Sequence, residues 1–204
     1  MLNWFRARSA NARKAKELYG AVVAAARQPE FYRDYGIPDT LNGRYEMIVL
    51  ALILLLERMR EEGAAASDVS RLTLEAFFTD MDDCMREIGV GDLSVPKKVK
   101  KAAAGFYERA KAYHEALDAG DKAAMAAALE MFVTGQEVMP AKTDGTAGTS
   151  SAAAAPRGLE PLKAAPLIMF DELAAYAFRQ RDTLAAADAE KVIAGNAFTT
   201  TFPK

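Results

Sequence analysis

Apolar residues recur at three- and four-residue steps along most of the chain, which is the spacing of one face of an α-helix. This spacing predicts a first helix over Ala12–Arg27. A second helix is predicted from about Leu41 to Glu62, with Asp39 or Thr40 as its N-cap. Its segment Met47–Leu56 is apolar on every side, and a helix of this kind usually forms the buried centre of a bundle. We therefore expect this second helix to lie at the core of the molecule.

A helical hairpin is predicted over Phe77–Tyr113. Gly89 stands where the C-terminal end of a helix favours a left-handed residue. Ser94 is in an N-cap position, with Pro96 just inside the following helix. The sequence thus predicts a short, defined turn between two helices, and we call this turn (residues 88–94) the elbow.

The charges on either side of the elbow oppose the usual electrostatics of helix ends. Carboxylates end the first helix and lysines begin the second, although the helix dipole disfavours each by about 0.3–1 kcal/mol when exposed. The carboxylates are Asp80, Asp82 and Asp83, and the lysines are Lys97, Lys98, Lys100 and Lys101. In one interpretation the two groups neutralise each other within the fold. In the other, the lysines form a docking surface for an acidic or phosphate-bearing partner.

The rest of the chain predicts further helices and one irregular segment. Helices are expected over Lys122–Glu137 and Pro166–Ala187, with an earlier connection over Gly63–Ser67. The segment Ala141–Arg157 consists mainly of Gly, Ser, Thr and Ala and has no large apolar residue. Because it cannot bury enough surface to offset the entropy of ordering, we expect a flexible insertion before the last helix.

The predicted fold class is all-α, as a single multi-helix, bundle-like domain. The chain is 51% hydrophobic and rich in alanine, which favours helix over strand. We expect a basic N-terminal segment, a helical domain, the flexible insertion, and a C-terminal helix and tail that pack on the same domain. These parts correspond to residues 1–17, 18–140, 141–157 and 158–204.

The N-terminal segment combines basic and aromatic residues. Trp4, Phe5, Arg6 and Arg8 together suit the surface of an anionic membrane. A second interpretation, equally open, is a frayed start whose aromatic side chains fold back onto the domain. No secretory signal is expected from this sequence. The longest apolar run, Met47–Leu56, is well short of the roughly 20 residues that a membrane-spanning helix needs, so we do not expect an integral membrane protein.

Residues suited to catalysis or metal binding are sparse. The net charge of −2 indicates no polyanionic partner, and the single cysteine, Cys84, excludes an intrachain disulfide. His114 is the only histidine, so the multi-histidine sites of zinc or di-iron enzymes cannot form. The chain has neither a phosphate-binding loop nor a serine nucleophile elbow. We expect a binding protein and not an enzyme, with no cofactor, no metal and no nucleic-acid partner.

Several short segments together carry a resemblance to a known family. In chain order they are Phe31-Tyr32, Pro38-Asp39-Thr40, Gly43-Arg44-Tyr45-Glu46, Asp80-Met81-Asp82, Met85-Arg86-Glu87, Gly89-Val90-Gly91-Asp92-Leu93 and Pro96-Lys97-Lys98. Their order and spacing resemble the ubiquinol–cytochrome c chaperone family, most specifically between about Leu18 and Tyr113. The resemblance implies an all-helical, non-enzymatic protein that is associated with the assembly of respiratory complex III.

The same resemblance implies a client and a location. The client would be newly made cytochrome b, and the protein would be cytoplasmic and peripherally associated with the inner membrane. The expected partner-binding residues come from the aromatic loop Phe31–Pro38, the next helix and the elbow: Phe31, Tyr32, Tyr35, Arg44, Asp92, Lys97 and Lys98. The rival function is a helical carrier or enzyme that holds a lipid or quinone in a pocket inside the bundle.

Overall fold

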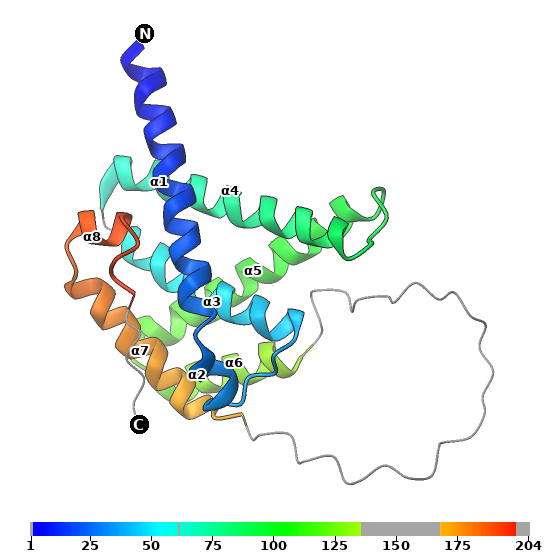
Figure 1. The fold of residues 1–204 in the computed structure, drawn as a ribbon. Helices are drawn as coiled ribbons and strands as arrows, with labels where there is room; N and C mark the ends of the chain where they lie inside the picture. Colours follow the sequence, from blue (N-terminus) through cyan, green and yellow to red (C-terminus); the bar gives the residue numbers. More distant parts are fainter. Residues whose placement is uncertain (1, 61, 136–167, 199–204) are drawn as a thin grey trace, which may run out of the picture.

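The computed structural model describes residues 2–60, 62–135 and 168–198, and these contain helices and no strand (Figure 1). The predicted all-α class is therefore confirmed for the described part of the chain. The helices are α1 (Leu2–Ala26), α2 (Pro29–Arg33), α3 (Leu41–Met59), α4 (Gly63–Glu87), α5 (Val95–Asp118), α6 (Lys122–Thr134), α7 (Phe170–Ala186) and α8 (Ala189–Ile193). The predicted insertion, Ala141–Arg157, lies outside the described residues.

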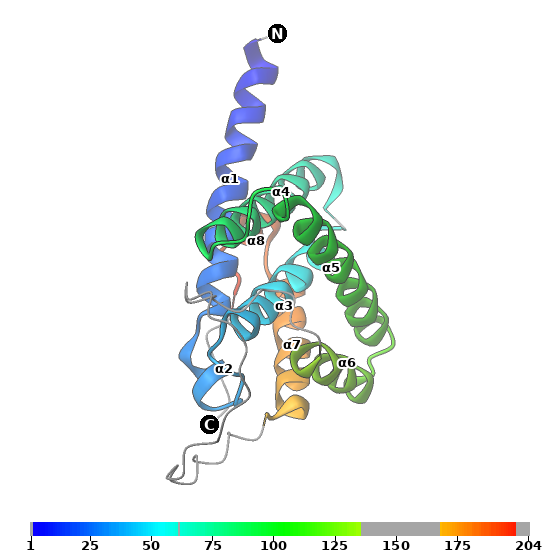
Figure 2. The ribbon, with the colours of Figure 1, turned by 90° about the vertical axis from the view of Figure 1, so that its right-hand side faces the viewer.

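Helix α3 is the centre of the molecule, as its apolar sequence predicts. It packs against α1, α4, α5, α6 and α7, and the second view shows it between the helices that surround it (Figure 2). Val49, Leu52 and Leu55 are completely buried. Burying a side chain of this size contributes roughly 1.5–3 kcal/mol, so the apolar run of α3 is the main hydrophobic contribution to the fold.

Helix α3 ends at Met59, three residues before the predicted end, and α4 follows almost at once. Gly63 has a positive φ of 80°, which a glycine adopts without strain and which lets the chain reverse direction. The predicted connection over Gly63–Ser67 is wrong, because these residues already form the first turns of α4. Their alanines favour helix, so the connection needs only the residues around the glycine.

Helix α1 begins at Leu2, ten residues before the predicted start. Among its described side chains, the first to join the core is Ala15, followed by Leu18 and Val22. From Ala15 onward α1 packs on α3 and α4, whereas its N-terminal turns project beyond the other helices (Figures 1 and 2). The side chains of residues 1–8 lie outside the described part, so the membrane contact expected of Trp4, Phe5, Arg6 and Arg8 stays a prediction.

The predicted aromatic loop is partly helical and mostly buried. Residues Pro29–Arg33 form the short helix α2, and the rings of Phe31 and Tyr35 are only 2% and 4% exposed. Helix α7 covers them, because the Tyr176 ring lies edge-on to Phe31 and the Met169 amide donates to the Tyr35 carbonyl. Phe31 and Tyr35, which were expected to bind a partner, therefore lie in the core with almost no exposed surface.

The C-terminal elements pack on the earlier helices. Helix α7 corresponds to the helix predicted over Pro166–Ala187, and it lies against α3 and α6. The short helix α8 was not predicted, and it contacts α1. After α8, the Ala197 carbonyl accepts a hydrogen bond from the buried Gln180 side chain at 3.5 Å. Residues 199–204 lie outside the described part.

Candidate functional site

The elbow has the geometry that its glycine predicts. Helix α4 ends at Glu87, and Gly89 has a positive φ of 86°. The amide of Gly89 donates to the carbonyl of Arg86 and that of Val90 to the carbonyl of Met85, both at 3.0 Å, which is the hydrogen-bond pattern of a Schellman motif. The backbone of the elbow is therefore held by its own hydrogen bonds and presents its apex residues to solvent.

Ser94 is at the N-cap position of α5, but its side chain makes no capping hydrogen bond. Pro96 lies inside the first turn, as predicted, and Val95 is buried beneath it. The start of α5 thus depends on the proline and on the packing of Val95. No carboxylate occupies the first turn of α5 to balance the lysines that follow.

Two of the three carboxylates at the acidic end of α4 have partners other than Lys97, Lys98 and Lys100. Arg86 contacts both Asp82 and Asp92 at 2.6 Å, and the Tyr19 hydroxyl donates to Asp80 at 2.7 Å. Within the described structure, Lys97, Lys98 and Lys100 make no ion pair with any carboxylate, while Asp80, Asp82 and Asp92 have other partners. This arrangement favours the docking interpretation of Lys97 and Lys98 over mutual neutralisation.

The apex of the elbow carries an exposed apolar side chain. Leu93 is 99% exposed, the highest value among the large hydrophobic residues of the described structure. In the sequence it lies between Asp92 and the lysines of α5, so an apolar side chain and positive charges occur within a few residues of each other. Sequence reasoning did not single out Leu93 as a site residue. The available signal was a leucine among turn residues, where an apolar side chain has no core to enter.

A groove adjoins the elbow between the start of α3 and the end of α4. Its volume is about 460 Å³, and Leu41, Cys84 and Ile88 supply its apolar wall. Asp39, Arg44 and Glu87 are its charged residues, and Ile88 directly precedes the glycine of the elbow. The groove and the elbow are thus neighbouring parts of one surface, which we call the groove–elbow surface.

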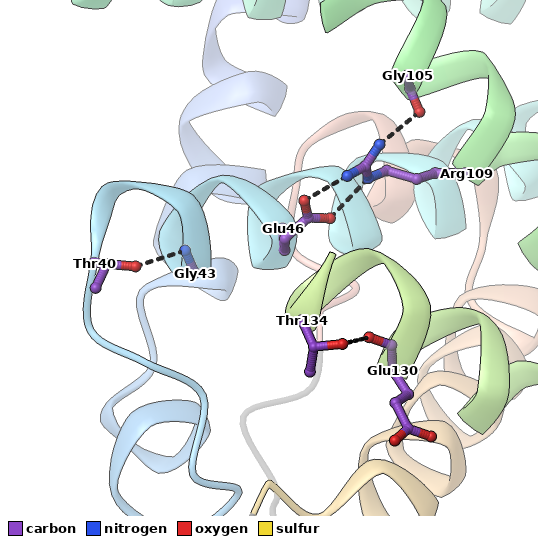
Figure 3. A network of polar contacts seen from close by, with 7 residues as sticks. All are labelled: Thr40, Gly43, Glu46, Gly105, Arg109, Glu130 and Thr134. Carbon is purple, nitrogen blue, oxygen red and sulfur yellow. Dashed lines mark hydrogen bonds and ion pairs between the residues drawn. The ribbon is translucent and has the colours of Figure 1, made fainter. Parts of the chain in front are cut away.

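A capping hydrogen bond and a closely packed glycine fix the start of α3 and so position Arg44 in this groove. The Thr40 hydroxyl accepts a hydrogen bond from the Gly43 amide at 3.1 Å and caps α3, as predicted (Figure 3). A Cβ atom on Gly43 would lie 2.0 Å from the carbonyl oxygen of Pro38, so only glycine fits there. Arg44 then contacts Asp39 at 2.6 Å, and this guanidinium lowers the pKa of the Asp39 carboxyl.

The structure separates the predicted partner-binding residues into three groups. Arg44 lines the groove, and Asp92, Lys97 and Lys98 are at the elbow. Tyr32 is half-buried: its hydroxyl donates to the carbonyl of Ala26 at 2.9 Å, and burial raises its pKa while the nearby Arg44 opposes that change. The third group, Phe31 and Tyr35, belongs to the core.

A second polar cluster, which sequence reasoning missed, is buried at the centre of the bundle. Arg109 of α5 donates to both carboxylate oxygens of Glu46 of α3, at 2.8 and 2.6 Å, and to the carbonyl of Gly105 at 2.9 Å (Figure 3). The two side chains are only 4% and 1% exposed. We call these residues, together with Tyr45, Tyr113 and Phe132, the Arg109 cluster.

The Arg109 cluster combines satisfied and unsatisfied polar groups. The guanidinium carbon of Arg109 lies 4.5 Å from the centre of the Phe132 ring, a cation–π contact with α6. The hydroxyls of Tyr45 and Tyr113 are buried and have no hydrogen-bond partner within the described structure. Burial raises the pKa of Glu46, and the hydrogen bonds from Arg109 oppose that rise. The cluster ties α3, α5 and α6 together.

The remaining chemistry of the described residues is limited. No three histidine, cysteine, aspartate or glutamate side chains in this part of the chain come together as a metal site. None of the described helices is long and apolar enough to cross a membrane. The only histidine, His114, lies at a cavity of about 590 Å³ between the ends of α3, α5 and α7, with its Nδ1 atom 3.0 Å from Glu57.

Comparisons with known proteins agree with the resemblance noted in the sequence. A family model described as ubiquinol-cytochrome C chaperone matches residues 33–202. The ubiquinol-cytochrome-c reductase complex assembly factor 1 of Xenopus laevis is 24% identical over 113 residues, which are 55% of this chain and 56% of that protein. The protein of the same name from Mus musculus is 25% identical over 118 residues, 58% of this chain and 40% of that protein. The chain spans about half the length of the curated relatives it matches.

A solved structure is similar over a larger share of the chain. The crystal structure of the Cbp3 homolog from Brucella abortus has a TM-score of 0.71 and 36% sequence identity. The match covers 96% of this chain and 93% of that one. The family model and this structural match include the groove and the elbow as well as the buried core. The chain belongs to the ubiquinol–cytochrome C chaperone family.

Proposed function

We propose that the chain is an assembly factor for ubiquinol–cytochrome c reductase (respiratory complex III) and that its client is newly made cytochrome b. Membership of the family and the names of the Xenopus and mouse relatives support the first part. The second part rests on the family resemblance. The protein acts by binding, without catalysis, and works at the cytoplasmic face of the inner membrane because the client is a membrane protein.

The exposure of Leu93 is the observation that supports a client-binding site at the elbow. An apolar side chain that is 99% exposed contributes nothing to the core, and its burial against a partner would release its full hydrophobic contribution. Lys97 and Lys98 follow Leu93 in the first turn of α5 and have no carboxylate partner in the described structure. Such a combination suits a client segment that presents an apolar patch beside acidic side chains.

The groove extends this contact toward α3. Leu41 is 37% exposed and adds apolar surface, while Arg44 and Glu87 supply charges of both signs that can set the orientation of the client. Tyr32 lies close enough to Arg44 for the guanidinium charge to oppose the rise in the Tyr32 pKa. Phe31 and Tyr35 support this surface from within the core instead of touching the client. The groove–elbow surface is therefore our proposed client site.

The test is a set of substitutions at the elbow that leave the core untouched. Leu93→Ser and the double variant Lys97→Glu/Lys98→Glu remove the apolar and the basic parts separately. Carboxylates near the start of α5 are favoured by the helix dipole, so melting temperatures should stay constant or rise. We expect both variants to lose co-purification of cytochrome b and to lower the level of assembled complex III in a strain without the native gene.

The matched control reverses the same charge one turn later. Lys100→Glu/Lys101→Glu changes the net charge equally but lies on the face that we assign to solvent. It should support normal complex III levels. Stable Lys97→Glu/Lys98→Glu and Leu93→Ser proteins that still assemble complex III would show that the elbow is not the client site. A pull-down from membranes that recovers other proteins but no cytochrome b would contradict the client assignment.

A further inference from the structure

A second groove lies at the other end of the molecule, between α6 and the start of α7. Its volume is about 550 Å³. Ala123, Ala126 and Ala127 form a small-residue wall on α6, and Ile168 and Met169 supply larger apolar side chains opposite. Small residues on one wall let another helix approach closely. A groove with this lining suits the apolar face of an amphipathic helix.

Three carboxylates surround this groove and make no ion pair within the described structure. They are Glu130, Asp171 and Glu172, and all three are exposed. Asp171 and Glu172 lie in the first turn of α7, where the helix dipole favours them. Glu130 does not lie in the first turn of a helix, so the helix dipole does not favour its charge. The Thr134 hydroxyl donates to the Glu130 backbone carbonyl, and the Glu130 carboxylate points away from that contact (Figure 3). The acidic rim therefore suits a basic helix.

The same chain contains a basic helix of this description. Ahead of Ala15, the sequence has Arg6, Arg8, Arg13 and Lys14 and no carboxylate, together with Leu2, Trp4 and Phe5. The first turn of α1 has no acidic residue to balance the positive end of its dipole, so nearby carboxylates would stabilise it. The Arg13 side chain is 77% exposed and makes only an exposed pair with Glu17 at 3.9 Å, which contributes little, and Lys14 is exposed as well.

The basic helix cannot reach the groove of its own molecule. Both views place the N-terminal turns of α1 at one end and the start of α7, with α6, at the opposite end (Figures 1 and 2). Because the two features lie at opposite ends, an antiparallel pair of copies would have each basic end at the same end as the acidic groove of the other. A twofold axis then relates the two contacts, and such closed dimers are the commonest form of protein self-association.

We propose that two copies of this chain associate by docking the N-terminal turns of α1 in the partner's α6–α7 groove. The complementary charges of the two surfaces carry the proposal. Exposed charges act over about a Debye length, so the association weakens as salt rises. An anionic membrane surface would compete for the same basic residues, and membrane contact and self-association then exclude each other.

The experiment measures the dimer dissociation constant of the full chain by sedimentation equilibrium at two salt concentrations. One variant carries Arg13→Glu/Lys14→Glu on α1, and another carries Glu130→Lys/Glu172→Lys at the groove. Each variant alters both symmetric contacts, so each should raise the dissociation constant by about tenfold or more at low salt. Combining the four substitutions restores opposite charges across each contact and should recover most of the lost affinity.

The control is Glu108→Lys/Glu115→Lys, which reverses two exposed carboxylates on α5 and should leave the dissociation constant unchanged. A chain that is monomeric at every concentration would overturn the proposal. So would a dimer that none of the charge reversals weakens, or single-site losses that the combined variant fails to restore. Loss of binding to anionic vesicles by Arg13→Glu/Lys14→Glu, with no change in self-association, would assign the segment to the membrane instead.

Discussion

Charged residues serve different purposes in the Arg109 cluster and at the elbow. In the cluster, Arg109 and Glu46 are almost completely buried and satisfy each other through two hydrogen bonds. At the elbow, Arg86 satisfies Asp82 and Asp92, and all three side chains are open to solvent. Lys97 and Lys98, which follow these ion pairs in the sequence, make no ion pair in the described structure.

The difference separates charges that the packing of the core requires from charges that have no ion pair in the described structure. A buried ion pair specifies how α3 and α5 pack, because either charge alone would be strongly destabilising in the interior. An exposed pair contributes little to stability and can be rearranged. The fold is therefore expected to be sensitive at Arg109 and tolerant at the elbow, and client binding is expected to show the opposite order.

Loss of one member of the buried pair should have the largest effect. Arg109→Met leaves Glu46 without a partner in the core, so the free energy of unfolding should fall by about 3–5 kcal/mol. Replacing both residues, as Glu46→Met/Arg109→Met, removes the unpaired charge and should recover most of that loss. Chemical denaturation monitored by circular dichroism measures each value.

The matched control is Arg86→Met at the elbow, which removes an arginine that contacts two carboxylates in solvent. We expect a loss of no more than about 1 kcal/mol, because exposed pairs are weak. An equal loss at Arg86 and Arg109 would remove the distinction between the two regions. A double variant at Glu46 and Arg109 that is no more stable than Arg109→Met alone would show that packing, and not the unpaired charge, dominates.

The unsatisfied hydroxyl of Tyr113 should give a smaller effect of opposite sign. This hydroxyl is buried without a hydrogen-bond partner in the described structure, so Tyr113→Phe should leave stability unchanged or raise it by about 1 kcal/mol. Tyr32→Phe is the control, because it removes a hydrogen bond to the Ala26 carbonyl and should cost about 0.5–1.5 kcal/mol. A Tyr113→Phe protein that is destabilised as much as the control would indicate a bound water or another partner at Tyr113.

The sequence predicted those elements whose signal is local. The apolar run of α3 and the glycine of the elbow each determine their surroundings within a few residues, and both predictions are confirmed. The short helices α2 and α8 were missed because five residues carry too little periodicity to detect. The start of α1 was placed too late because the residues before Ala15 do not follow the apolar spacing of the core.

The candidate site was predicted in part, for the same reason. Asp92 lies at the elbow, Lys97 and Lys98 lie in the first turn of α5 and Arg44 lines the groove, and their role in partner binding stays a prediction. The partner of Glu46 could not be foreseen, because Arg109 is 63 positions away in the sequence. Nor could the burial of Phe31 be foreseen, since α7 covers it from the far end of the chain. Long-range packing decides both features.

The smallest predicted effect concerns the pH dependence of the groove. Arg44 lowers the pKa of the Asp39 carboxyl below its ordinary value of about 3.9. A lowered pKa in the folded state means that this contact stabilises the protein above the unfolded-state pKa, and that the contribution is lost as pH falls through the folded-state value. Both side chains are about half exposed, so the change in overall stability should be near the limit of detection.

The titration of Asp39 itself, followed by NMR of its side-chain carboxyl, is the sharper measurement. Arg44→Gln should return the pKa of Asp39 toward the ordinary value, while Asp34, whose pKa is lowered by Arg33, should titrate as before. An Asp39 pKa that does not respond to Arg44→Gln would mean that the two side chains are not paired in solution. Arg44 would then be unpaired in the groove, like Lys97 and Lys98 at the elbow, and the basic part of the client surface would extend to α3.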